Sequence, residues 1–240
     1  RVDTRGVEGI ETRTIGREEE LGKMQSAFEQ AVEQRQLHLI NIVAEAGTGK
    51  SRLLYEFTKW LDMQKQAMHL FKGRATQEIA QIPYALLRDI FSSSFGIQDH
   101  DTATVARDKL EKGIRSYVEN EETGKLYSHF IGHLIGLDYS TSPYLKGILG
   151  DAQQIRNLAF HYAMQFFTDI TREQVGVLLL EDIHWADYGS LDFFEHLMNT
   201  KTDLPLLIIG LTRSTLFEQR PDWGTGPVQT LRLDLLPLSD

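Results

Sequence analysis

Hydrophobic residues along the chain change their spacing several times, and each change predicts a different kind of element. Short runs rich in Val, Ile and Leu predict buried strands, whereas apolar residues three and four apart predict helices with one buried face. The predicted strands cover residues 38–43, 68–71, 177–180 and 206–211, with a final alternating segment at Leu231, Leu233 and Leu235. The predicted helices cover residues 18–36, 51–66, 85–91, 103–117, 126–135, 153–170 and 191–198.

The order of these elements predicts one α/β domain. Strands that alternate with helices pair in parallel and carry helices on both faces, so we expect a three-layer fold with a parallel sheet. A stretch that is mostly helical, at about residues 82–171, interrupts the alternation and is predicted to be a helical insertion. Residues 1–14 are polar and include Gly6 and Gly9, which predicts a linker before a domain at 15–240.

Composition excludes several classes of protein but does not identify a function. The 240 residues carry a formal net charge of −9, which argues against a general nucleic-acid-binding surface, because such a surface needs a basic face. The chain has no cysteine, which excludes disulfides and Cys-based zinc sites and fits a reducing compartment. No apolar run approaches the roughly 18 residues that a membrane helix needs, and residues 1–13 have no apolar signal core. We therefore expect a cytoplasmic protein, of which this chain is an excised piece.

The segment AEAGTGKS at residues 44–51 is typical of a phosphate-binding loop. It lies between a predicted strand and a predicted helix, so backbone amides and a helix N-terminus can converge on phosphates. Lys50 supplies the charge and Ser51 a hydroxyl for Mg²⁺. Ala44 replaces the first glycine of the usual pattern, but it adds only a methyl group. The predicted nucleotide contacts are Ala46, Gly47, Thr48, Gly49, Lys50, Ser51 and Arg52.

Two adjacent acids, Glu181 and Asp182, follow the predicted strand at 177–180. A phosphate loop needs carboxylates at the end of a neighbouring strand to hold Mg²⁺ and orient water, so Ser51, Glu181 and Asp182 are the candidate metal ligands. By position Glu181 takes the metal and Asp182 polarises water, but the usual order is Asp first, so the division of roles stays open. These acids lie far along the chain from the loop. This separation suits a sheet in which another strand is inserted, at the centre, between the strand before the loop and the strand before the acids. Arg213 follows the strand at 206–211 and is a candidate sensor of the γ-phosphate.

Two further patterns are interpreted as incidental. Residues 200–203 read TKTD, like a guanine signature, but they follow a predicted helix instead of a strand, which favours ATP over GTP. His129 and His133 are spaced like metal ligands on a helix. Phe130 follows His129 where a zinc protease has Glu, so we interpret both as ordinary helical histidines.

The ordered set IGRE at residues 15–18, AEAGTGKSRLLYEF, LLLEDIHWAD, LLIIGLTR and LRLDLLPLSD resembles one family. It is similar to the AAA-type ATPase module of signal-transduction ATPases with numerous domains (STAND). That module occurs in large bacterial transcriptional activators of the LuxR/MalT type and behind class III adenylate/guanylate cyclase domains. The lead-in TRGVEGIETRTIGREEEL is most similar to the cyclase-linked version. The resemblance covers nearly the whole chain and is weakest between about 97 and 155.

The resemblance implies a P-loop ATPase fold with ATP or ADP and Mg²⁺ as its ligands. It implies that Ile15, Gly16 and Arg17 lie near the adenine and ribose, and that His184 and Asp187 couple the acids to a moving element. A winged-helix lid normally follows PLS in this family, so we expect the lid to be absent from this chain. The implied partners are other domains of the same polypeptide, cyclase or DNA-binding domains and helical repeats, with nucleotide-dependent self-association. We expect no direct contact of this domain with nucleic acid or membrane.

These observations together predict a switch domain that binds ATP and hydrolyses it slowly, with Glu181, Asp182 and Arg213 as the catalytic candidates. Two alternatives remain at this point. One is a scaffold that holds nucleotide without turnover, which the Glu-Asp order and the absent lid leave open. The other is a helical protein-interaction module with a vestigial site.

Overall fold

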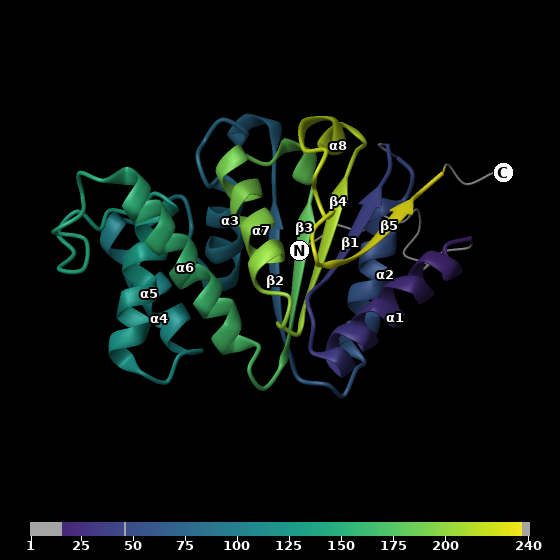
Figure 1. Ribbon diagram of the computed structural model, residues 1–240, viewed down its shortest axis with the longest axis horizontal. Helices are drawn as coiled ribbons and strands as arrows, with labels where there is room; N and C mark the ends of the chain where they lie inside the picture. The colour runs from purple at the N-terminus through teal and green to yellow at the C-terminus, as the bar shows by residue number, and fades with distance from the viewer. Residues whose placement is uncertain (1–15, 46, 237–240) are drawn as a thin grey trace.

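A five-stranded parallel sheet forms the centre of the protein (Figure 1). The computed structural model describes residues 16–45 and 47–236. The strand order is β2-β3-β4-β1-β5, so β4 separates β1 from β3, as expected for a central inserted strand. The strands are β1 (His38–Val43), β2 (Met68–Arg74), β3 (Val175–Glu181), β4 (Leu206–Thr212) and β5 (Gln229–Asp234).

Helices cover both faces of this sheet. Because successive residues of a strand point to opposite faces, Leu178 and Leu180 belong to one buried cluster and Val177 and Leu179 to the other. Helices α1 and α2 pack on one face, α3, α6 and α7 pack on the other, and α4 and α5 lie farthest from α1 (Figure 1). The helices are α1 (Glu18–Gln34), α2 (Lys50–Asp62), α3 (Ala85–Phe95), α4 (Ala103–Arg115), α5 (Glu121–Leu134), α6 (Ala152–Ile170), α7 (Tyr188–Thr200) and α8 (Thr215–Gln219), with 3₁₀ turns η2 (Gln77–Ile79) and η3 (Ile183–Trp185).

Local capping explains where several helices begin. The side chains of Thr102, Asn120, Asp151 and Asp187 each accept a hydrogen bond from a backbone amide in the first turn of α4, α5, α6 and α7. The cap at Asn120 starts α5 five residues before the predicted position. The prediction began too late because the residues of the first turn are polar and do not show the apolar spacing of a helix. Helices α3 to α6 lie between β2 and β3 in the chain, and we retain residues 82–171 as a proposed insertion.

Two differences from the predicted elements have simple reasons. Strand β2 continues to Arg74, past the predicted end, with Lys72 and Arg74 exposed and Phe71 and Gly73 buried in alternation. Gly73 is required there, because an added Cβ would lie 2.4 Å from Ile90 Cγ1 of α3. Helix α8 was not predicted, since five residues are too short for a helical repeat to show.

Within the described ranges, the helices all lack the combination of length and apolarity that crossing a bilayer would need.

A buried polar pair connects the segment after α8 to strand β1, which lies between β4 and β5. Asn41 is 1% exposed, and its Oδ1 accepts a 3.0 Å hydrogen bond from Trp223 Nε1. We expect Trp223→Phe to lower the free energy of unfolding by about 2 kcal/mol, because Asn41 loses a partner inside the core. Urea unfolding measures this change. The control is Trp60→Phe, at a ring that stacks on Phe57, and equal losses in both variants would contradict a role for the hydrogen bond.

Candidate functional site

The loop between β1 and α2 has the backbone of a phosphate cradle. Gly47 and Gly49 have φ angles of 83° and 90°, a region that residues with a Cβ rarely adopt. An added Cβ at either glycine would meet nothing within 4 Å, so the loop leaves open space above its amides. Ala44 is buried in the core cluster beneath α1 and α2, so its methyl group is accommodated. Ala46 lies outside the described residues.

The side chains of the loop fold onto its own carbonyl groups. Lys50 Nζ donates to Ala44 O and, at 3.3 Å, to Glu45 O, while Thr48 Oγ1 donates to Glu45 O at 2.8 Å. Burial lowers the pKa of Lys50, whereas the nearby Asp182 carboxylate raises it and Arg213 lowers it. The three predicted residues Lys50, Asp182 and Arg213, from three different strand ends, therefore lie within electrostatic reach of one another.

The two remaining predicted residues of α2 differ in their surroundings. Ser51 is the second residue of the helix and is exposed, so its hydroxyl is accessible beside the loop. Arg52 instead forms an ion pair with Glu56 one turn along α2, and its guanidinium lies 5.3 Å from the centre of the Tyr55 ring. Ser51 therefore lies beside the loop, whereas the Arg52 side chain contacts residues of its own helix, α2.

The two acids differ in what surrounds them. Glu181 ends β3 and Asp182 follows in a left-handed conformation with φ 55°. Burial raises the pKa of Glu181, and the Arg74 guanidinium on β2 is the main charge that opposes this. Asp182 forms a 3.3 Å ion pair with Arg74 and, unlike Glu181, also affects the pKa of Lys50. Asp182 is thus the acid that lies between the loop and β2.

His184, in the 3₁₀ turn after the acids, is at the centre of this group. It is 6% exposed, and both ring nitrogens are buried without a hydrogen-bond partner, as is Nε of Arg213. Burial lowers the pKa of His184, with smaller effects from Asp182, Arg213 and Lys50. Unpaired buried polar atoms cost about 1–3 kcal/mol each. Nε of Arg213 is a donor, whereas a neutral imidazole carries one donor and one acceptor. The positive charges of Lys50 and Arg213 and the open glycine loop fit the oxygen-rich phosphates of a nucleotide with Mg²⁺.

Arg17 joins the beginning of α1 to the loop. It is 6% exposed, and its guanidinium donates to Thr48 O at 3.1 Å, to Leu236 O, and to Glu20 at 2.8 Å. The predicted neighbour Gly16 has φ 87° and donates to Glu18 at 3.0 Å, whereas Ile15 lies outside the described residues. Arg17 therefore lies against the back of the loop and holds it to the segment after β5.

Asp187 connects two helices at this edge of the sheet, a role that the sequence did not specify. It is 4% exposed and caps α7 by accepting from Ser190 N at 2.9 Å and Ser190 Oγ at 2.7 Å. The same carboxylate accepts from Tyr84 N at 2.7 Å and Leu86 N at 3.2 Å, where Tyr84 has φ 59°. Tyr84 and Arg74 were missed by sequence analysis, because neither belongs to a recognisable pattern.

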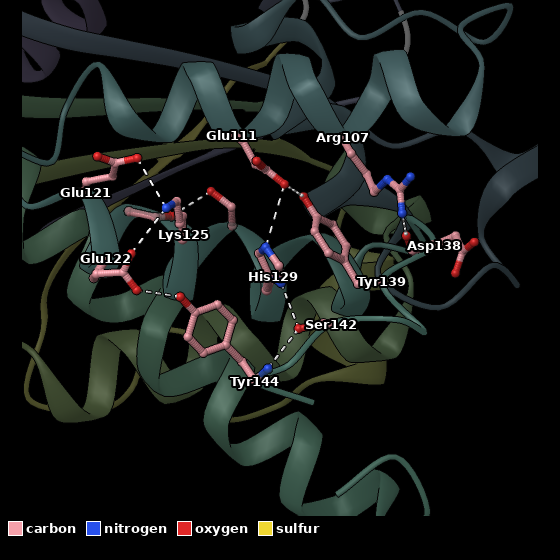
Figure 2. Close-up of polar contacts among 12 residues, drawn as sticks. Arg107, Glu111, Glu121, Glu122, Lys125, His129, Asp138, Tyr139, Ser142 and Tyr144 are labelled. Atoms are coloured by element: carbon pink, nitrogen blue, oxygen red, sulfur yellow. Dashed lines mark hydrogen bonds and ion pairs between the residues drawn. The ribbon is translucent and has the colours of Figure 1, made fainter. Parts of the chain in front are cut away.

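The two incidental patterns lie away from this group. Residues 200–203 connect α7 to the amino end of β4, and Leu37 N, just before β1, donates to Thr202 O at 2.9 Å. They are therefore at the opposite edge of the sheet from the loop. His129 lies in α5, where Nδ1 is 2.7 Å from Ser142 Oγ and Nε2 is 3.7 Å from Glu111 (Figure 2).

Comparisons with known proteins identify the family and the fold. The family model for the AAA ATPase domain matches residues 13–209. A search of curated proteins found no match. The chain resembles a solved structure of Drosophila ORC bound to DNA, with TM-score 0.52 and 14% identity over 98% of this chain and 45% of that one.

Two Aeropyrum pernix structures are also similar. ORC1 in complex with DNA has TM-score 0.46 and 13% identity over 93% of this chain and 46% of that one. ORC2 in ADPNP-ADP complexes has TM-score 0.41 and 10% identity over 95% and 50%. The chain thus spans about half the length of the structures it matches. The Drosophila likeness confirms the predicted three-layer α/β fold of the P-loop class. Since the family model matches most of its length, the chain belongs to the AAA ATPase domain family.

Proposed function

We propose that this AAA ATPase domain binds ATP with Mg²⁺ at the β1–α2 loop and hydrolyses it slowly as a switch. The observation that carries the proposal is the convergence of Lys50, Asp182 and Arg213 around the buried His184. These residues follow β1, β3 and β4, which are adjacent in the sheet. In parallel sheets, ligands bind at the carboxyl ends of the strands, where these residues lie.

Binding of the phosphates would rest on the loop and the helix that follows it. The amides of residues 47–51 and the N-terminus of α2 present donors and a partial positive charge, and the Lys50 ammonium adds a full one. Displacing Lys50 from the carbonyls of Ala44 and Glu45 would free its donors for phosphate oxygens. On the other side of the loop, Arg17 supports its backbone, and we propose that residues 15–17 lie toward the nucleoside.

Hydrolysis would depend on positioning and charge. Mg²⁺ would be held by the Ser51 hydroxyl and a carboxylate, and it supplies neutralisation of phosphate charge. We assign the orientation of the attacking water to Asp182, because its charge, unlike that of Glu181, affects the pKa of Lys50, and support of the metal to Glu181. Arg213 would stabilise the charge that develops on the γ-phosphate.

A nucleotide-binding scaffold without turnover is the second candidate. One observation favours it: Asp182 is ion-paired with Arg74 at 3.3 Å, and a carboxylate engaged in that pair would not orient a water. The Glu-Asp order of the acids agrees with this alternative.

The setting in the cell is also a proposal. We propose that the domain, residues 15–240 after the lead-in 1–14, belongs to a cytoplasmic, multidomain bacterial signalling protein of the cyclase-linked or LuxR/MalT type. Its partners would be the other domains of that polypeptide and further copies of itself. The net charge of −9 supports a domain that does not itself contact nucleic acid. Resemblance of the lead-in at residues 4–21 to the cyclase-linked module supports the first of the two settings.

Asp182→Asn should keep the binding of Mg·ATP and lower its turnover by about 100-fold or more, because a group that orients or deprotonates water contributes about this factor. Phosphate release in single-turnover experiments measures the rate, and thermal unfolding with Mg·ATP measures binding. Asp203→Asn, at the opposite edge of the sheet, is the control and should turn over normally. If the unchanged chain binds Mg·ATP but releases no phosphate, the scaffold alternative replaces hydrolysis.

A further inference from the structure

The sheet has two outer strands, β2 and β5, and their free edges differ (Figure 1). On β2, side chains of α3 cover backbone groups that point away from the sheet. Asp89 accepts a 2.7 Å hydrogen bond from Arg74 N, and Ser93 Oγ donates to Lys72 O at 3.2 Å. Proteins commonly cover an edge in this way, because an open edge pairs with other chains. The edge of β2 is therefore blocked by its own domain.

The outer edge of β5 has no comparable cover. Leu235 N donates to Val43 O at 2.9 Å, so the backbone of Leu235 faces β1. Because successive residues of a strand direct their N–H and C=O groups to alternate sides, those of Thr230, Arg232 and Asp234 point away from the sheet. In the part of the chain that the structure describes, these groups have no hydrogen-bond partner. The edge therefore presents a row of free donors and acceptors.

The sequence along this edge is complementary to itself. Residues 231–235 read LRLDL. When a second copy runs antiparallel with Leu233 opposite Leu233, leucine faces leucine throughout and Arg232 faces Asp234 of the second copy. Arg232 and Asp234 are also the residues whose backbone groups point outward, so they form the hydrogen-bonded pairs of an antiparallel ladder. The register that matches the charges therefore also matches the backbone.

The charged side chains are accessible for this pairing. Those of Arg232 and Asp234 are 47% and 57% exposed, and they form a 2.8 Å ion pair along the strand. The Arg232 guanidinium also lies 4.5 Å from the centre of the Phe217 ring, which holds it on one face of the sheet. In the antiparallel register, arginine and aspartate alternate around the symmetry axis, so each charge has neighbours of opposite sign.

We propose that the outer edge of β5 is a docking surface for a second copy of this chain, in an antiparallel pairing centred on Leu233 that joins the two sheets. This surface would serve the self-association proposed above, but it does not rest on nucleotide binding. The pairing is short, because the carbonyl of Leu236 already accepts a hydrogen bond from Arg17. We therefore expect a weak dimer.

The first test uses the unchanged 240-residue chain without nucleotide. Light scattering should show a rise in molecular mass as the protein concentration increases to about 1 mM, where a dissociation constant of that order still gives a large fraction of dimer. In NMR spectra of the same series, the backbone amide signals of Thr230, Arg232 and Asp234 should shift, whereas those of Lys72 and Arg74 should not. These shifts locate the surface without any variant.

The second test reverses the charges. Arg232→Asp and Asp234→Arg each place like charges opposite one another, so each should weaken the dimer about tenfold or more. Mixed in equal amounts, the two variants should associate as tightly as the unchanged chain, because each aspartate of one then faces an arginine of the other. Lys146→Asp makes the same change of charge at an exposed site in the loop before α6, and it should dimerise normally.

Four results would overturn the proposal. The unchanged chain stays monomeric up to about 1 mM, the amides of β2 shift in place of those of β5, either single variant dimerises as well as the unchanged chain, or the mixture associates no better than each variant alone. Circular dichroism checks that the variants fold, and the amide shifts of the unchanged chain decide if one does not. None of these results bears on the binding of Mg·ATP.

Discussion

Lys50→Ala should remove all stabilisation of the protein by Mg·ATP. A ligand that binds only the native state at about 100 times its Kd adds about 2.7 kcal/mol. For a chain of this size, that corresponds to a rise in melting temperature of about 5–10 °C. Without the Lys50 ammonium, the loop loses the full positive charge that lies nearest its amides. Thermal unfolding followed by circular dichroism, with and without Mg·ATP, measures both proteins.

Lys146→Ala is the control, because Lys146 is an exposed lysine in the loop before α6. It should keep the full shift. A rise of equal size in Lys50→Ala would show that Mg·ATP binds elsewhere. The same assay compares nucleotides, and we expect GTP to protect less than ATP, since residues 200–203 lie at the wrong edge of the sheet to read guanine. Equal protection by GTP would contradict that preference.

Asp187→Ala should lower the free energy of unfolding by about 3–5 kcal/mol. The carboxylate satisfies the amides of Tyr84, Leu86 and Ser190 together with the Ser190 hydroxyl. Each buried donor left unpaired costs about 1–3 kcal/mol, and relaxation of the helix ends recovers part of the sum. Urea unfolding measures the loss.

Two variants separate the parts of this effect. Asp151→Ala removes a comparable cap from α6 at an exposed position, and it should cost only about 1 kcal/mol. Asp187→Ser keeps a cap for α7 but is too short to reach α3, so its loss should fall between the two. If Asp187→Ala costs no more than Asp151→Ala, the contact with Tyr84 and Leu86 contributes nothing to stability.

The elements that were predicted correctly depend on local patterns. Strand β1 has the predicted bounds, because its run of buried residues stops at a glycine loop. Convergence of the strand ends follows from parallel pairing, so Lys50, Asp182 and Arg213 could be expected at one edge before the structure was known.

The parts that could not be predicted depend on contacts between distant residues. Arg17 contacts Leu236 across 219 positions, and Asp187 contacts Tyr84 across 103. No periodicity encodes such pairs. Glu181 and Asp182 have different surroundings because the backbone at residue 182 is left-handed. Aspartate tolerates this conformation, but an aspartate in a sequence does not predict it. The unpaired nitrogens of His184 follow from burial by several elements, which no single segment reveals.

The position of β1 in the sheet has a consequence for how the protein acquires its structure. Both neighbours of β1 are late strands: β4 begins at Leu206 and β5 at Gln229. While a ribosome is still making residues 44–205, β1 has two open edges and the loop after it has no fixed base. Long-range parallel pairing is intrinsically slow, and unpaired edges attract other chains. A nucleotide site at the loop after β1 would therefore be complete only when almost the whole domain has been synthesised, and until then β1 keeps two edges open to other chains.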